Sequence, residues 1–227
     1  MRPGPCRAAG LLAVATLWAT LGTAALVSGF PLLGRRPLSW LVADPAGAAL
    51  YRAGLVAGAG LLVAFHGWVR SRFPVSRSFS LALLAGLAGQ VVAALVPIDG
   101  GPGAARVHTV AALLLGASLP VAMWRFAVAQ PPGRWRRVAR RLALVEAGAV
   151  GAGVALSAYS VAPLAEILPA AAFHLWIGAV TFAPVGHRRA LAPRPPSDHA
   201  GNIRRRLPVP PIAIATTWGA RDARSHR

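Results

Sequence analysis

Three ionisable residues in this sequence are spaced so that they could meet and do chemistry. Asp99 follows Pro97 in a glycine-rich turn, His108 comes a short loop later, and Glu166 begins a later apolar stretch on the same side. Two carboxylates and an imidazole can hold a zinc ion that keeps one position open for water, or can form a general acid–base pair. The same residues could equally form a binding mouth for a substrate or ion.

A plainer interpretation of these residues remains open. Asp99 could cap the helix that His108 begins, or pair with Arg106, while His108 lies in the hydrated headgroup region. The sequence contains no dense metal-binding pattern such as HExxH. We therefore expect no cofactor, and keep a zinc site at Asp99, His108 and Glu166 as an alternative.

Two further histidines stand in similar contexts, Phe65-His66-Gly67-Trp68 and Phe173-His174-Leu175-Trp176. The apolar stretches would place His174 near the middle of the membrane and His66 near its inner surface, and an ionisable group inside a bilayer is costly. A pair of axial haem ligands is one hypothesis. The favoured one is a neutral His174 hydrogen-bonded inside a helix bundle, with Gln90 as a polar neighbour at similar depth.

Glu146 lies a little beyond a cluster of arginines. We expect Arg125, Arg140 or Arg141 to extend along the helices and pair with its carboxylate. The alternative is a proton relay between Glu146 and His66. The tryptophans near predicted membrane edges are interpreted as interfacial anchors. They are Trp40, Trp68, Trp124 and Trp135.

The amino-acid composition indicates which kind of structure holds these ionisable residues. Of 227 residues, 56% are apolar and only 13% are charged, yet the formal charge is +18 and the mean hydropathy is +0.55. These values exclude an ordinary soluble domain and a disordered chain. Six stretches are long and apolar enough to cross a bilayer as helices. They are residues 8–33, 53–69, 79–96, 108–128, 142–162 and 165–185.

We therefore predict an all-α, polytopic transmembrane bundle of about six helices. Twenty of the 24 arginines fall on one side of these spans, which places both termini in the cytoplasm. A bacterial inner (plasma) membrane is the expected location. The first stretch is too long for a signal peptide, and we expect it to be retained as a helix.

Residues 186–227 are rich in proline and arginine and are predicted to form a disordered cytoplasmic tail. Such a tail would be attracted to anionic lipid headgroups. No nucleic-acid recognition motif is present, so nucleic acid is not an expected partner. Small residues such as Gly54 and Gly58 favour close helix packing within the bundle, or alternatively a homo-oligomer.

One segment also carries a resemblance. Residues 94–101, Ala-Leu-Val-Pro-Ile-Asp-Gly-Gly, are followed by Arg106-Val107-His108, and Leu38-Ser39-Trp40-Leu41 and Gly54 occur earlier. Over about residues 8–185 the chain resembles the bacterial membrane family catalogued as domain of unknown function 998. The resemblance implies a bundle of about six helices and brings no known activity.

We predict a non-enzymatic membrane protein that acts in small-solute transport or as an accessory envelope component. Its polar outer mouth would contain Asp99, His108 and Glu166. The alternative is a membrane-embedded, metal-dependent hydrolase or lipid-modifying enzyme in which the same residues are catalytic. A haem protein using His66 and His174 is the third hypothesis.

Overall fold

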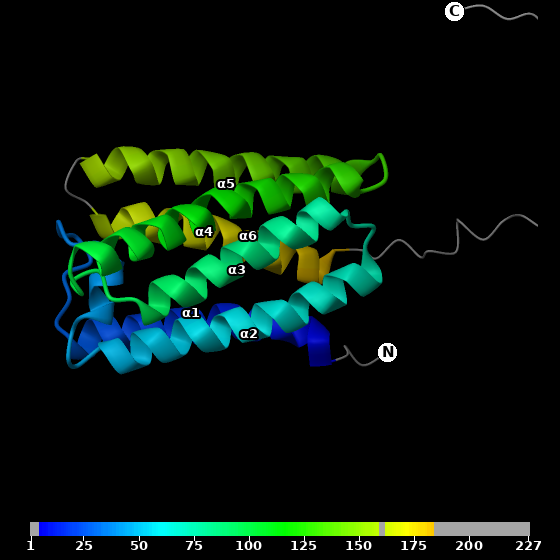
Figure 1. The fold of residues 1–227 in the computed structure, drawn as a ribbon. Coiled ribbons are helices and arrows are strands. Elements are labelled where there is room, and N and C mark those ends of the chain that lie inside the picture. The colour runs from blue at the N-terminus through cyan, green and yellow to red at the C-terminus, as the bar shows by residue number, and fades with distance from the viewer. Residues whose placement is uncertain (1–4, 159–161, 184–227) are drawn as a thin grey trace, which may run out of the picture. The chain divides into compact units, whose positions relative to one another are not determined.

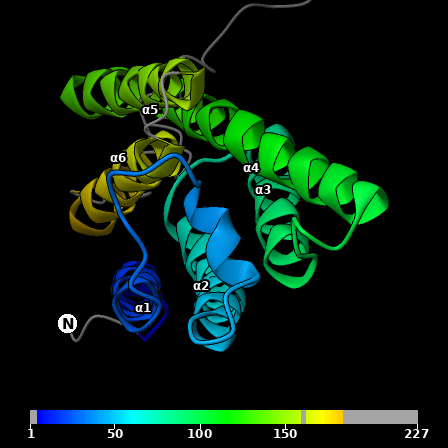
Figure 2. The same ribbon diagram turned by 90° about the vertical axis from the view of Figure 1, so that its left-hand side faces the viewer.

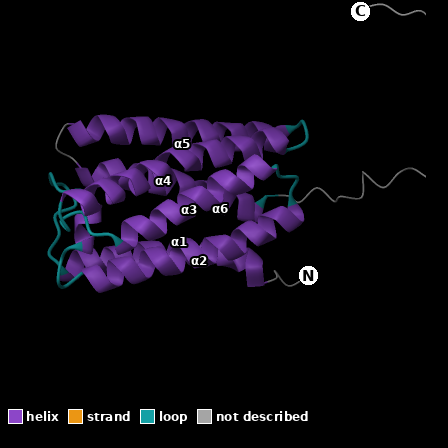
Figure 3. Cartoon of the chain, viewed as in Figure 1, coloured by secondary structure: helices purple, strands orange, loops and turns teal. Residues whose placement is uncertain are grey.

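The computed structural model describes residues 5–158 and 162–183, which form helices joined by short loops (Figures 1 and 3). Residues 186–227, the predicted tail, lie outside the described residues. Six long helices run side by side, and one short 3-10 helix, η1, follows the first. They are α1 (Pro5–Val27), η1 (Leu38–Val42), α2 (Ala48–Arg72), α3 (Arg77–Leu95), α4 (Pro102–Ala129), α5 (Arg134–Ala158) and α6 (Ala162–Phe182).

Five of the long helices, α1, α2, α3, α4 and α6, are long and apolar enough to cross a membrane. The predicted helical membrane protein is therefore confirmed. The remaining helix, α5, begins with five arginines within its first eight residues, and this run of charge sets it apart from the other five. The membrane span predicted over residues 142–162 stays a prediction, as do the orientation and the membrane in which the protein resides.

Local sequence explains where the helices begin. The Ser76 hydroxyl caps α3 by accepting a 3.2 Å hydrogen bond from the Phe79 N–H. Gly101 precedes α4 with φ of +90°, a backbone conformation that residues with a Cβ rarely adopt. Pro102 then occupies the first turn, where a missing N–H costs nothing. These signals explain why α3 begins directly after Ser76 and α4 directly after Gly101.

The helices pack in sequential pairs, α1 with α2, α3 with α4, and α5 with α6. Viewed from one end, α1 to α4 and α6 surround a central region, and η1 crosses that end of the bundle (Figure 2). A small apolar cluster holds η1 against the helices through Leu38 and Leu41, which pack with Ala24 and Ala25 of α1. The loop containing η1 thus covers the end where Asp99 and Glu166 were predicted.

Small residues let α1 and α2 approach closely. A Cβ added to Gly54 would overlap the side chain of Thr20, and one added to Gly58 would lie 2.7 Å from Leu17 Cγ. Both glycines are buried at the contact with α1. The pattern at Gly54 and Gly58 therefore serves packing within the bundle, which is the first of the two interpretations of this motif.

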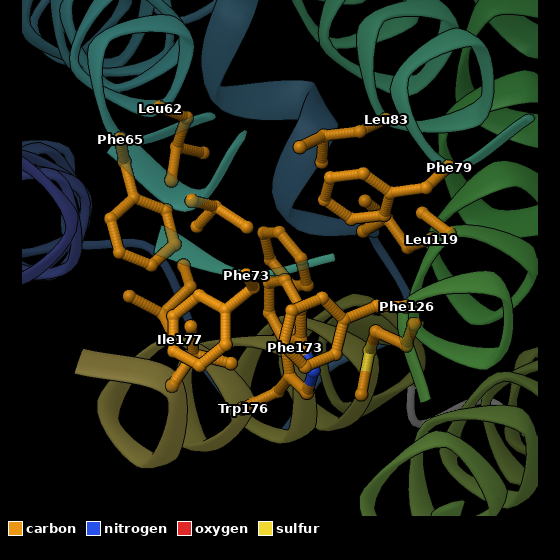
Figure 4. Packing of buried hydrophobic residues seen from close by; sticks show 14 of the residues in the cluster. Leu62, Phe65, Phe73, Phe79, Leu83, Leu119, Phe126, Phe173, Trp176 and Ile177 are labelled. Atoms are coloured by element: carbon orange, nitrogen blue, oxygen red, sulfur yellow. The ribbon is translucent and has the colours of Figure 1, made fainter. Parts of the chain in front are cut away.

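The half of the bundle near the α2–α3 turn is filled by aromatic side chains (Figure 4). Trp176 lies at the centre, in edge-to-face contact with Phe65 and Phe126 and stacked on Phe173. Trp68 belongs to this cluster, is only 9% exposed and stacks on Phe65. Its prediction as an interfacial anchor is wrong, because it faces the bundle interior.

Candidate functional site

A cavity of about 260 Å³ lies between the helices in the half of the bundle nearer η1. It is lined by side chains from α1, α2, α3, α4, α6 and η1. Leu62, Leu119 and Phe173 line the cavity and also belong to the aromatic cluster, so that cluster forms its floor. Most of the lining is apolar, with a small set of polar groups, as in typical small-molecule sites. Those polar residues are Thr20, Ser39, Tyr51, Gln90, His108, Glu166 and His174.

His108 enters the cavity from the first turns of α4 and is 3% exposed. Its Nδ1 lies 2.8 Å from the carbonyl oxygen of Val96, at the end of α3. Because a carbonyl oxygen can only accept, Nδ1 carries the proton in this contact. One hydrogen bond thus fixes both the orientation of His108 and the beginning of the α3–α4 loop.

Glu166 enters the cavity from the second turn of α6. Its Oε2 accepts a 3.0 Å hydrogen bond from the backbone N–H of Ser39 in η1. His108 and Tyr51 line the same cavity as Glu166. The structure therefore brings together two of the three residues in the predicted outer mouth, His108 and Glu166, on facing helices.

Asp99 does not join them. It is exposed in the loop between α3 and α4 and does not line the cavity. In residues 5–158 and 162–183 there is no group of three or more His, Cys, Asp or Glu residues that could hold a metal ion. The three-residue zinc site considered from the sequence thus lacks one of its ligands, because the loop directs Asp99 away from His108 and Glu166.

The two remaining histidines lie in different environments. His66 on α2 is buried, with Nε2 3.0 Å from the Ser80 hydroxyl of α3, and it does not line the cavity. His174 on α6 does line it, in edge-to-face contact with Trp18 of α1. His66 and His174 therefore face different spaces, whereas two axial haem ligands must face the same one. Gln90 shares the cavity with His174, and its amide donates a 2.8 Å hydrogen bond to the Leu55 carbonyl.

Glu146 on α5 is fully buried, and neither of its carboxyl oxygens has a hydrogen-bond partner among the described residues. The predicted pairing with Arg125, Arg140 or Arg141 is wrong. The guanidinium of Arg140 instead lies 5.8 Å from the centre of the Trp124 ring. Residues 5–158 and 162–183 contain no hydrogen bond joining Glu146 to His66, since His66 engages Ser80.

Several polar residues that line the cavity can accept hydrogen bonds through the Glu166 carboxyl group, the His108 ring and the Gln90 carbonyl oxygen. The hydroxyl groups of Thr20, Ser39 and Tyr51 can also donate, and Glu166 is the only acidic residue among the described lining residues. Among the described residues, none of the arginines lines the cavity, although the chain has 24. The cavity is therefore chemically suited to a ligand whose polar group donates hydrogen bonds or carries positive charge.

Sequence reasoning missed several lining residues, among them Ser39 and Tyr51. Ser39 carried a signal, because a single hydroxyl lies between apolar residues in Leu38-Ser39-Trp40-Leu41. Tyr51 lies in the first turn of α2, and a lone tyrosine near a membrane edge usually indicates an interfacial anchor. Only the fold of the preceding loop directs both residues inward.

Comparison with known proteins gives one family. A family model described as "Protein of unknown function (DUF998)" matches residues 8–183, which include all the residues that line the cavity. No curated protein and no solved structure matches the chain. The chain therefore belongs to the DUF998 family, whose function is not known.

Proposed function

We propose that this protein takes part in small-solute transport, and that the cavity near η1 binds an amphipathic molecule with an amine or other hydrogen-bond-donating head group. The observation that carries the proposal is an apolar cavity with a carboxyl group, Glu166, and an imidazole, His108, in its lining and with no arginine among the described lining residues. The head group would lie against these two side chains, and the apolar part would extend toward Leu62 and Phe173.

Size and charge support this ligand class. A cavity of about 260 Å³ lies just below the roughly 300–1,000 Å³ of drug-sized sites, which favours a small ligand. The partly buried carboxyl group of Glu166 favours a cationic head, and an anionic head would meet no arginine among the described lining residues. The aromatic floor closes the cavity toward the α2–α3 turn, so transport requires this cluster to rearrange.

The test compares three ligands of equal chain length, n-octylamine, n-octanol and octanoate, added to the full-length protein in lipid nanodiscs. Trp18 is one of seven tryptophans and lines the cavity, so the part of the fluorescence change that is lost in Trp18→Phe reports occupancy. We expect octylamine to bind at least about ten-fold more tightly than octanoate, and Glu166→Gln to reduce this preference. Asp99→Asn removes an exposed carboxylate outside the cavity and should leave binding unchanged.

A second pair of variants fills space instead of changing charge. Gly116 lines the cavity, and a Cβ added there meets no atom within 4 Å, so Gly116→Phe can occupy the cavity without a clash at its first carbon. Gly60 on α2 is equally unobstructed but lies outside the cavity, which makes Gly60→Phe the matched control. Loss of octylamine binding only in Gly116→Phe supports the cavity as the site; equal binding in both variants contradicts it.

Binding and transport are separated by measuring exchange of labelled octylamine into proteoliposomes against an empty-liposome control. Protein-dependent exchange that Gly116→Phe abolishes supports a transporter. Binding without exchange contradicts the transport part of the proposal and identifies a non-transporting binding protein.

A further inference from the structure

A second cleft, of about 260 Å³, lies at the other end of the bundle, beside the turn between α2 and α3. It is lined by residues of both helices and of the turn. They are Arg70, Val75, Ser76, Arg77, Ser80 and Leu81. The cavity near η1 and this cleft share no lining residue, and the proposed function does not use the cleft.

The cleft is strongly basic. Arg70 and Arg77 are both exposed, and none of the acidic residues in the described chain lies on α2, on α3 or on the turn between them. Guanidinium groups bind phosphate oxygens through paired, charge-assisted hydrogen bonds. Two arginines from adjacent helices without a neighbouring carboxylate therefore favour a phosphate-bearing ligand.

Two hydroxyl groups lie beside the arginines and are held in position by hydrogen bonds. Ser76 Oγ caps α3 and lies 2.9 Å from the Ser78 hydroxyl. Ser80 Oγ lies 3.0 Å from Nε2 of the buried His66, so His66 supports one wall of the cleft from beneath. Serine hydroxyls beside arginines commonly contribute to phosphate contacts.

An apolar residue beside the arginines distinguishes a phospholipid from a free phosphate ion as the ligand. Leu81 lines the cleft, yet it is 70% exposed and lies on α3, a helix long and apolar enough to cross a membrane. An apolar surface thus lies next to the arginines. An acyl chain of a lipid would cover this surface, whereas a free phosphate ion would leave it uncovered. Basic pockets at the ends of transmembrane helices bind anionic lipid headgroups in this way.

We propose that the cleft formed by Arg70, Ser76, Arg77 and Ser80 binds the phosphate of an anionic membrane lipid, with an acyl chain of that lipid against Leu81. This site lies on the helical bundle and is separate from the contacts predicted for the arginine-rich tail.

The experiment measures lipid retention by native mass spectrometry of the full-length protein, after exchange into detergent with phosphatidylglycerol or phosphatidylcholine. The test variant is Arg70→Gln/Arg77→Gln. The control, Arg72→Gln/Arg137→Gln, removes two exposed arginines that do not line the cleft. We expect the wild type and the control to retain phosphatidylglycerol over phosphatidylcholine, and the test variant to retain about ten-fold less.

Two outcomes overturn the proposal. Equal loss in test and control variants would show general electrostatic attraction without a site. Displacement of the lipid by millimolar inorganic phosphate, with phosphate alone binding as tightly, would identify free phosphate as the ligand.

If the glutamine variant does not fold, Arg70→Lys/Arg77→Lys keeps both charges and loses the paired hydrogen bonds. It should retain several-fold less lipid than Arg72→Lys/Arg137→Lys, and equal retention contradicts the proposal.

Discussion

The backbone N–H of Ser39 donates a 3.0 Å hydrogen bond to Glu166 Oε2 and thereby joins η1 to the second turn of α6. Because Ser39 is buried, a variant without an acceptor here leaves a buried N–H unsatisfied. We expect Glu166→Ala to lower the free energy of unfolding by about 1–3 kcal/mol. Glu166→Gln retains an acceptor oxygen and should melt close to the wild type. Tryptophan fluorescence melting of the purified protein measures both, and equal melting of the two variants would contradict this role.

The close approach of α1 and α2 at Gly54 gives a second prediction. Gly54→Ala adds one carbon that overlaps the Thr20 side chain, so it should destabilise the protein by about 1–3 kcal/mol. Gly60 lies on the same helix with no atom within 4 Å of an added Cβ. Gly60→Ala should therefore be neutral or slightly stabilising, since alanine favours helix. Thermal melting of the two variants in one detergent compares them directly; an unchanged melting temperature for Gly54→Ala would count against the packing role.

The helical bundle could be predicted because apolar length and the need to satisfy backbone hydrogen bonds together leave few alternatives in a membrane. The same reasoning does not predict which face of each helix points into the bundle. Trp68 was placed at the membrane edge from its position near the end of an apolar stretch. The structure buries it, because α2 continues to Arg72 and its last turns pack on the aromatic cluster.

The candidate site could be predicted only in part, for a similar reason. His108 and Glu166 lie within the first two turns of α4 and α6, and helix starts at one end of a bundle are close together, so their meeting follows from topology. Asp99 lies in a loop whose path depends on the positive φ of Gly101 and on the contact between His108 and Val96. Neither the direction of such a loop nor the inward turn of Ser39 leaves a periodic pattern in the sequence.

Asp44 gives a prediction about pH. It lies in the loop before α2, where hydrogen bonds from the Ser28 hydroxyl and the Gly47 and Ala46 N–H groups hold the pKa of its carboxyl below its usual range. The ionised form is therefore favoured in the folded loop, and the stabilisation is present above the ordinary aspartate pKa of about 4. It is lost as the pH falls through the lowered folded-state value.

Amide hydrogen exchange at Ala46 and Gly47 measures this effect after correction for the intrinsic pH dependence of exchange. Protection should be constant from pH 7 to about 5 and should fall only below about 4. Asp44→Asn should show weaker protection without that acid transition. A transition of equal size in Asp44→Asn would assign it to another group.

Substitution of Glu146 should change the free energy of unfolding in the opposite direction to substitution of Glu166. It is fully buried, and its two carboxyl oxygens have no partner among the described residues. A buried polar group without partners costs stability, and its replacement by an apolar side chain of similar size is often stabilising. We expect Glu146→Met to raise the free energy of unfolding by about 1–3 kcal/mol, whereas Glu166→Met should lower it, because only Glu166 accepts a hydrogen bond. A lower melting temperature for Glu146→Met would instead mean that this carboxyl group has a stabilising partner.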